Sequence, residues 1–226
     1  MRRLASIALL SATTIFATLP AVAQTETPAG VGVVVRLDKR LDELVPAGAT
    51  IEKVADGFVF LEGPVWRSSD SRLFYSDLRG NAIYQWTAAD GVRDYSKPFF
   101  AGDGTGLRGV GPNGIALDSQ GRLLACVYGS RSVIRIEKDG TRSTLAERYQ
   151  GKRLNSPNDL VVARDGTVYF TDPSFGLEGT DNSPLREQTV NGVYRIRPNG
   201  EITLLTGEQE RPNGLVFSPD ERILYV

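Results

Sequence analysis

A short motif recurs four times in this chain, each time at the start of a strand-sized apolar run. The four copies are Glu62-Gly-Pro-Val-Trp, Pro112-Asn-Gly-Ile-Ala-Leu, Pro157-Asn-Asp-Leu-Val-Val and Pro212-Asn-Gly-Leu-Val-Phe. Their oxygen-bearing residues, Glu62, Asn113, Asn158 and Asn213, are separated by 51, 45 and 55 residues. Self-similarity at a period of about 20–50 residues is the signature of a repeat architecture. The motif therefore constrains the fold more strongly than any single predicted element does.

One repeat resolves into four short strands. Runs of β-branched and aliphatic residues cover 114–118, 122–128, 132–137 and 141–147, and turn-forming residues separate them. Four short antiparallel strands in a unit of nearly fifty residues are typical of a β-propeller blade. A β-sandwich is the main alternative, but it does not require the same Asn at the same place in each unit. We therefore expect an all-β fold, a β-propeller.

The fourth repeat stops at Val226, in the middle of its second predicted strand. Propellers close about four to eight blades into a ring, and an unpaired hydrophobic strand edge promotes aggregation. We therefore expect a C-terminally incomplete propeller, with about three and a half repeats present out of roughly six.

The first 23 residues are predicted to be a signal peptide. Arg2 and Arg3 form a basic start, residues 4–19 are largely apolar, and Ala21-Val-Ala has the small-x-small form that signal peptidase cleaves. Several hydroxyl residues and Pro20 leave this run short of the ~18 apolar residues that a spanning helix needs. We expect cleavage after Ala23, a periplasmic or secreted mature protein, and no membrane association after cleavage.

The rest of the chain is interpreted as a leader, residues 24–36, and a partial β-propeller domain, residues 37–226. Leu37, Leu41 and Leu44 are expected on one face of a short helix where that domain begins. Cys126 is the single cysteine, so an internal disulfide is excluded. The formal net charge is −1 and there is no long basic run, so the chain lacks the electrostatic footprint of a nucleic-acid-binding protein.

The repeated positions predict a metal site. Inner strands of all blades line the central channel of a propeller, so equivalent residues near their starts converge. Glu62, Asn113, Asn158 and Asn213 would then bring carboxylate and amide oxygens together, in a chain that contains no histidine. Such oxygens select hard cations. Ca²⁺, with six to eight flexible oxygen ligands, fits them better than Mg²⁺, and another divalent cation is the alternative.

Turn chemistry is the competing interpretation of the same motif. Asn-Gly is a favoured turn pair, and a preceding Pro biases the residue before it toward extended structure. Pro-Asn-Gly is therefore also typical of a turn that recurs between strands. Two residues argue against this interpretation. Asn158 is followed by Asp159 rather than Gly, and the first copy carries Glu62, a poor turn residue.

Four longer motifs carry a family resemblance. They are Glu62-Gly-Pro-Val-Trp, Leu154-Asn-Ser-Pro-Asn-Asp-Leu, Asp165-Gly-Thr-Val-Tyr-Phe-Thr-Asp-Pro-Ser-Phe-Gly and Arg211-Pro-Asn-Gly-Leu-Val-Phe-Ser-Pro. Together they resemble the gluconolactonase and senescence-marker-protein (regucalcin-like) family of calcium-dependent lactonases, from about Leu37 to Val226. The resemblance implies a six-bladed propeller that hydrolyses a small sugar lactone with a divalent metal, usually calcium, in its central channel.

The resemblance also implies roles for individual positions. Glu62, Asn158 and Asn213 would be metal ligands, and Asn158 would also contact the substrate. Asn113 is similar to an Asn that related phosphotriesterase propellers place at their calcium, and it is assigned to substrate binding. The family's general base, an Asp one blade further on, would lie beyond residue 226, so the catalytic base is unknown. Some sugar lactonases carry an Arg two residues before the substrate-contacting Asn, where this chain has Ser156.

A Ser-His-Asp triad needs a histidine, and this chain contains none. Metal-assisted hydrolysis is therefore the natural hydrolytic route. Asp159 and Asp172 are the visible acidic candidates for the base, although turn chemistry accounts for both. Ser174 has no nucleophile-elbow sequence around it and is not interpreted as a nucleophile. Two other functions stay open: a non-enzymatic propeller that binds protein or carbohydrate, and a strictosidine-synthase-like propeller with metal-independent chemistry.

Overall fold

A computed structural model describes residues 31–226 of the chain, which fall into two compact units divided between Lys53 and Val54. The predicted signal peptide and the start of the predicted leader lie outside the described residues. In the first unit, the expected short helix is a 3₁₀ helix, η1 (Lys39–Glu43), whose N-terminus is capped by Asp38. Within residues 31–226, no helix is long and apolar enough to cross a membrane.

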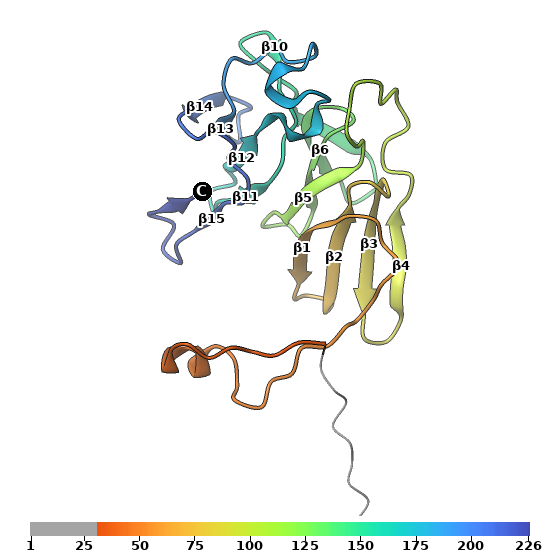
Figure 1. Ribbon diagram of the computed structural model, residues 1–226, viewed down its shortest axis with the longest axis vertical. Coiled ribbons are helices and arrows are strands. Elements are labelled where there is room, and N and C mark those ends of the chain that lie inside the picture. Colours follow the sequence, from red (N-terminus) through yellow and green to blue (C-terminus); the bar gives the residue numbers. More distant parts are fainter. Residues whose placement is uncertain (1–30) are drawn as a thin grey trace, which may run out of the picture. The chain divides into compact units, whose positions relative to one another are not determined.

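Three four-stranded antiparallel sheets follow one another in the second unit, each in simple up-and-down order (Figure 1). The first contains β1 (Leu61–Arg67), β2 (Arg72–Asp77), β3 (Ala82–Thr87) and β4 (Gly91–Ser96). The second contains β5 (Pro112–Leu117), β6 (Leu123–Val127), β7 (Ser132–Ile136) and β8 (Arg142–Ala146). The third contains β11 (Leu160–Val162), β12 (Val168–Asp172), β13 (Gly192–Ile196) and β14 (Ile202–Thr206).

Shorter elements complete the second unit. A hairpin of β9 (Arg148–Tyr149) and β10 (Lys152–Arg153) precedes the third sheet, and β15 (Val216–Phe217) pairs with β16 (Leu224–Tyr225) after it. Two 3₁₀ helices, η2 (Ser174–Gly176) and η3 (Thr180–Asn182), lie in the connection from β12 to β13. The prediction of an all-β fold built from blade-like repeats is confirmed, whereas the six-blade total and the incompleteness stay predictions.

The second strand of the second sheet is buried on both faces. Along β6, Leu124 and Cys126 belong to a core cluster shared with the third sheet, whereas Leu123, Ala125 and Val127 belong to a cluster shared with the first sheet. A strand between two apolar layers has no polar face, which explains the unbroken apolar run in the sequence. Burying each large aliphatic side chain in this way contributes about 1.5–3 kcal/mol to folding.

Hydrogen bonds from sheet to sheet hold the repeated Asn residues. The Ser76 hydroxyl in β2 donates to the carbonyl oxygen of Asn113, and the Thr171 hydroxyl in β12 donates to the carbonyl oxygen of Asn213 at 2.7 Å. The Gly114 backbone N–H donates to the carbonyl oxygen of Asn158 at 2.8 Å. Each bond joins one repeat to the next at the backbone of a repeated residue or of its neighbour.

Candidate functional site

The four repeated residues lie around one pocket of about 300 Å³. Asn113 and Asn158 are buried, Glu62 is partly buried and Asn213 is exposed. The pocket is completed by residues that the sequence analysis did not select: Phe60, Leu78, Arg79, Arg108, Tyr128 and Phe175. The structure thus brings together all the predicted site residues, while their roles as ligands or substrate contacts stay predictions.

Tyr128 orients two of the asparagines. It directly follows β6, and its hydroxyl oxygen accepts hydrogen bonds from Nδ2 of Asn113 at 2.9 Å and from Nδ2 of Asn158 at 2.8 Å. Because both amide nitrogens are engaged, each Oδ1 is left available for a ligand. Burial raises the pKa of Tyr128 to about 12, so its hydroxyl stays neutral at physiological pH.

Glu62 is the one carboxylate among the residues that line this pocket. Burial raises the pKa of Glu62, and the negative charge of Asp159 raises it further, against a hydrogen bond from the Gly63 backbone N–H. The surroundings therefore disfavour the ionised form of Glu62. A cation in the pocket would reverse this effect, since an opposite charge a few ångströms away stabilises a carboxylate.

The loop between β12 and β13 contributes Phe175 to the pocket wall. The Arg211 guanidinium lies 5.8 Å from the centre of the Phe175 ring, and the Arg108 backbone N–H donates to the carbonyl oxygen of Gly176 at 2.8 Å. The Ser156 hydroxyl accepts from the Gly176 backbone N–H at 2.8 Å. Ser156 is therefore a buried anchor for this loop and does not line the pocket.

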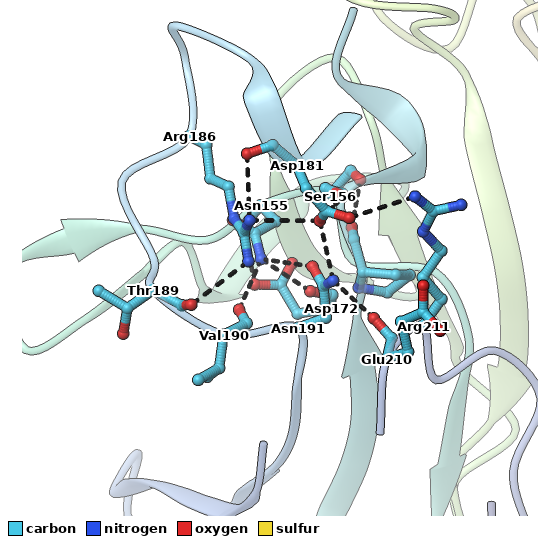
Figure 2. Close-up of polar contacts among 12 residues, drawn as sticks. Asn155, Ser156, Asp172, Asp181, Arg186, Thr189, Val190, Asn191, Glu210 and Arg211 are labelled. Carbon is cyan, nitrogen blue, oxygen red and sulfur yellow. Dashed lines mark hydrogen bonds and ion pairs between the residues drawn. The ribbon is translucent and has the colours of Figure 1, made fainter. Parts of the chain in front are cut away.

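A polar network beside the pocket fixes the same loop (Figure 2). Asp181 is at its centre and binds Arg186 at 3.3 Å and Arg211 at 3.2 Å. It also accepts hydrogen bonds from Asn191 Nδ2 at 2.9 Å and from the Ser174 hydroxyl at 2.6 Å. These contacts lower the pKa of Asp181 to about 2. The Ser174 hydroxyl is therefore part of this network.

Asp172 lies in that network and not at the pocket. It is fully buried, and its Oδ2 accepts a hydrogen bond from the Asn155 backbone N–H at 2.7 Å (Figure 2). On the other side of the same segment, Arg131 Nε donates to the carbonyl oxygens of Leu154 and Asn155 at 2.8 and 2.9 Å. Arg131 and Asp172 thus hold the residues that lead to Asn158, and the Asp172 carboxyl does so through a contact 17 residues away in the sequence and not through turn chemistry.

Substituting Asp172 by Asn is expected to flatten the pH dependence of stability. Burial raises the pKa of Asp172 to about 7, whereas the pKa of an Asp in the unfolded chain is about 4. Between these values the native state holds a proton that the unfolded state releases. This contribution to stability is therefore full below about pH 4 and falls by up to about 1.4 kcal/mol per pH unit as the pH rises to about 7.

Urea unfolding of both proteins at several pH values from 4 to 8 measures this effect. The free energy of unfolding of the wild type, relative to Asp172→Asn, should decrease across that range. A difference that does not change with pH would show that Asp172 is ionised in the folded protein.

A larger cavity, of about 620 Å³, is lined by residues of the first and second sheets and contains none of the repeated residues. Two of its arginines are paired with acidic residues of the same cavity, Arg67 with Asp70 at 2.7 Å and Arg122 with Glu137 at 2.9 Å. The smaller pocket is the better candidate, because all four repeated residues line it.

The family model described as SMP-30/Gluconolactonase/LRE-like region matches residues 60–226. The chain belongs to this family. A gluconolactonase of Zymomonas mobilis subsp. mobilis is 36% identical over 203 residues, which cover 87% of this chain and 56% of that protein. This chain therefore spans about half the length of the Zymomonas mobilis protein.

Solved structures of similar proteins agree with the family membership. A gluconolactonase of Xanthomonas campestris is 37% identical, with a TM-score of 0.65 over 76% of this chain and 55% of that one. A regucalcin of Agrobacterium tumefaciens, described as a calcium-binding protein, is 16% identical, with a TM-score of 0.52 over 74% of this chain and 49% of that one. At 16% identity, the similarity to the regucalcin concerns the fold alone.

The donor set at the pocket fits a hard cation. Within residues 31–226, no group of three or more His, Cys, Asp and Glu side chains is placed to hold a metal. The pocket instead offers one carboxylate, from Glu62, and three side-chain amides. Amide and carboxylate oxygens are the ligands that Ca²⁺ takes, with water filling the remaining positions.

Proposed function

We propose that the protein hydrolyses a sugar lactone, with a divalent cation, Ca²⁺ by preference, held at the pocket. The observation that carries this proposal is the convergence of oxygen donors from four successive repeats, two of them held by the Tyr128 hydroxyl with each Oδ1 left available. The gluconolactonase relatives support the choice of lactones as the substrate class.

Each of the four repeated residues has a role in this proposal. Glu62, Asn158 and Asn213 would hold the cation, and Asn113 and Asn158 would contact the substrate. When bound, the cation supplies Lewis-acid chemistry, which polarises the lactone carbonyl and stabilises the developing oxyanion.

Tyr128 and the apolar pocket residues shape the surroundings of the reaction. Tyr128 keeps the amide nitrogens of its two asparagines turned away from the ligand, because both are already hydrogen-bonded to its hydroxyl. Phe60, Leu78 and Phe175 supply an apolar wall that limits the access of water.

We place the mature protein in the periplasm or outside the cell, on the strength of the predicted signal peptide. The N-terminal sequence of the protein isolated from its host tests this placement. It should begin at Gln24, and a sequence beginning at Met1 would contradict it.

Chelation is expected to abolish hydrolysis by the whole protein. The rate of acid release from gluconolactone, after subtraction of the spontaneous rate, should fall at least about a hundredfold in EDTA, because the stabilisation of the oxyanion is lost. Added Ca²⁺ should restore it, and Mg²⁺ should restore it less, since Mg²⁺ demands a stricter octahedral site. A rate that survives complete removal of metal would favour metal-independent chemistry, and no hydrolysis in excess Ca²⁺ would contradict the lactonase assignment.

A further inference from the structure

Two arginines line the pocket beside the four repeated residues, and the proposed function uses neither of them. Arg79 lies in the turn between β2 and β3, and Arg108 lies in the connection from β4 to β5. Both residues are exposed. Their side chains therefore lie where the pocket opens to solvent.

Backbone contacts bring the two arginine segments together. The Gly111 backbone N–H donates to the carbonyl oxygen of Leu78, the residue before Arg79, at 3.1 Å. A Cβ at Gly109, the residue after Arg108, would lie 3.5 Å from Cγ of Leu78. The two arginines therefore reach the same pocket from neighbouring stretches of the chain.

Neither guanidinium is neutralised by the part of the chain that the structure describes. Among residues 31–226, no Asp or Glu side chain forms an ion pair with Arg79 or Arg108, and this includes Glu62 in the same pocket. The Arg79 guanidinium instead lies 5.3 Å from the centre of the Phe60 ring. Contact with an aromatic face leaves the N–H groups at the edge of a guanidinium able to donate to a ligand.

The charge balance of the pocket wall favours an anion. Even with Glu62 ionised, the wall has two positive charges, from Arg79 and Arg108, against one negative charge. A wall with excess positive charge attracts anions, and the planar guanidinium matches the oxygens of a carboxylate or a phosphate. A lactone ring itself carries no charge. The anionic group would therefore be a substituent of the lactone.

We propose that Arg79 and Arg108 are specificity-determining residues, which select lactones that carry an anionic substituent, a carboxylate or a phosphate, over neutral lactones. This inference rests on the proposed function, because it assumes that the pocket takes a lactone. It deepens that function by naming the charge of the substrate. The two arginines bind a part of the substrate that does not react.

Three other causes have to be separated from this one. Hydrolysis of any lactone produces a carboxylate, so the arginines could bind the product instead. They could also donate to the hydroxyl groups of a neutral sugar. Both of these roles would affect neutral and anionic lactones alike. A cation in the pocket would attract an anionic lactone without any help from the arginines, so the test needs a condition without metal.

Two matched pairs of substrates isolate the substituent. The γ-lactones of gluconate and glucarate differ only in a hydroxymethyl group against a carboxylate, and gluconolactone differs from phosphogluconolactone only in a phosphate. The kcat/KM of the whole protein in Ca²⁺ is measured for each lactone, after subtraction of the spontaneous rate. The variants are Arg79→Gln, Arg108→Gln and the double substitution. Arg93→Gln is the matched control, since Arg93 is exposed on β4 and does not line the pocket.

The measured quantity is the ratio of kcat/KM for the anionic lactone to that for the neutral lactone of the same pair. In the wild type this ratio should be about 10–100 in at least one pair, and that pair identifies the substituent as carboxylate or phosphate. Each single Gln variant should lower the ratio about tenfold, because a charge-assisted hydrogen bond is lost. The double variant should bring it near one, and Arg93→Gln should leave it at the wild-type value.

Binding of the two γ-lactones in EDTA, measured by calorimetry, separates the arginines from the cation. The wild type should still bind the glucarate lactone more tightly than the gluconate lactone, and the double variant should not. A preference that disappears with the metal would assign it to the cation and overturn the inference.

The kinetic outcomes distinguish this inference from the proposed function. A wild type that hydrolyses no member of either pair in excess Ca²⁺ would overturn both together. Ratios near one in both pairs, or variants that slow both members of a pair equally, would overturn the inference alone and leave a lactonase. Circular dichroism checks folding. Where a Gln variant does not fold, the corresponding Met variant, which keeps a long side chain without the charge, is judged by the same ratio.

Discussion

Replacing Glu62 by Gln is expected to weaken Ca²⁺ binding by at least about a hundredfold. Glu62 is the one carboxylate among the residues lining the pocket. Replacement of groups that only surround a metal's ligands already costs about 10–100-fold in affinity, and loss of the single anionic ligand should cost more. Calorimetric titration of the whole protein with Ca²⁺ measures the change. Lactone hydrolysis at limiting Ca²⁺ should fall in parallel.

The matched control is Glu208→Gln, which removes the same charge from an exposed residue that does not line the pocket. Its affinity for Ca²⁺ should equal that of the wild type. If Glu62→Gln bound Ca²⁺ as tightly as this control, the cation would have to be held elsewhere, and a binding role for the propeller would gain support.

Replacing Gly63 by Ala is expected to destabilise the protein by about 3 kcal/mol or more. Gly63 has a φ of 51°, in the left-handed region that costs other residues about 1–2 kcal/mol. The added Cβ would also lie 2.6 Å from the backbone nitrogen of Ile115, and backbone at the centre of packed sheets cannot move aside cheaply. Such overpacking typically costs a further ~1–3 kcal/mol. Urea unfolding of the whole protein measures the loss.

Gly140→Ala separates the two causes. Gly140 also has a positive φ, of 84°, but no atom lies within 4 Å of the position that its Cβ would take. In this control variant, the free energy of unfolding should fall only by the cost of a positive φ for a residue with a Cβ, about 1–2 kcal/mol. Equal losses in the two variants would mean that the inner strands of the first two sheets are not as close as the structure places them.

The repeat architecture could be predicted because its signals are local. The sequence predicted strands at 114–118, 122–128, 132–137 and 141–147, and the structure has β5 to β8 within two residues of all of these bounds. Turn residues and apolar runs mark each strand without reference to the rest of the chain. The register of the repeats then placed the motif residues near one another, because blades of a propeller present equivalent positions to one axis.

The rest of the pocket could not be predicted, because it depends on contacts between distant segments. Tyr128 meets Asn158 only once the second and third sheets have packed, and in the sequence it merely ends an apolar run. Arg108 and Phe175 come from two long connections, whose paths are set by hydrogen bonds such as that between Arg108 and Gly176. Connections carry function more often than they carry a sequence signal for their conformation.

The two acidic candidates show the same limit. In the sequence, Asp159 and Asp172 are both residues beside a strand end, and local chemistry does not separate them. In the structure, Asp172 is enclosed in the network beside the pocket, where it binds the segment before the inner strand of its own repeat, whereas the Asp159 carboxylate packs against Gly114 of the second repeat. These contacts form only when the sheets are packed.

A crystal structure of the whole protein grown with Ca²⁺ tests the central claim most directly. We predict an ion at the pocket with oxygen distances of about 2.3–2.6 Å to Glu62, Asn158 and Asn213, which is the usual range for Ca²⁺. The amide nitrogens of Asn113 and Asn158 should remain on the Tyr128 hydroxyl. An ion bound away from these residues, or a pocket that stays empty in excess Ca²⁺, would contradict the account.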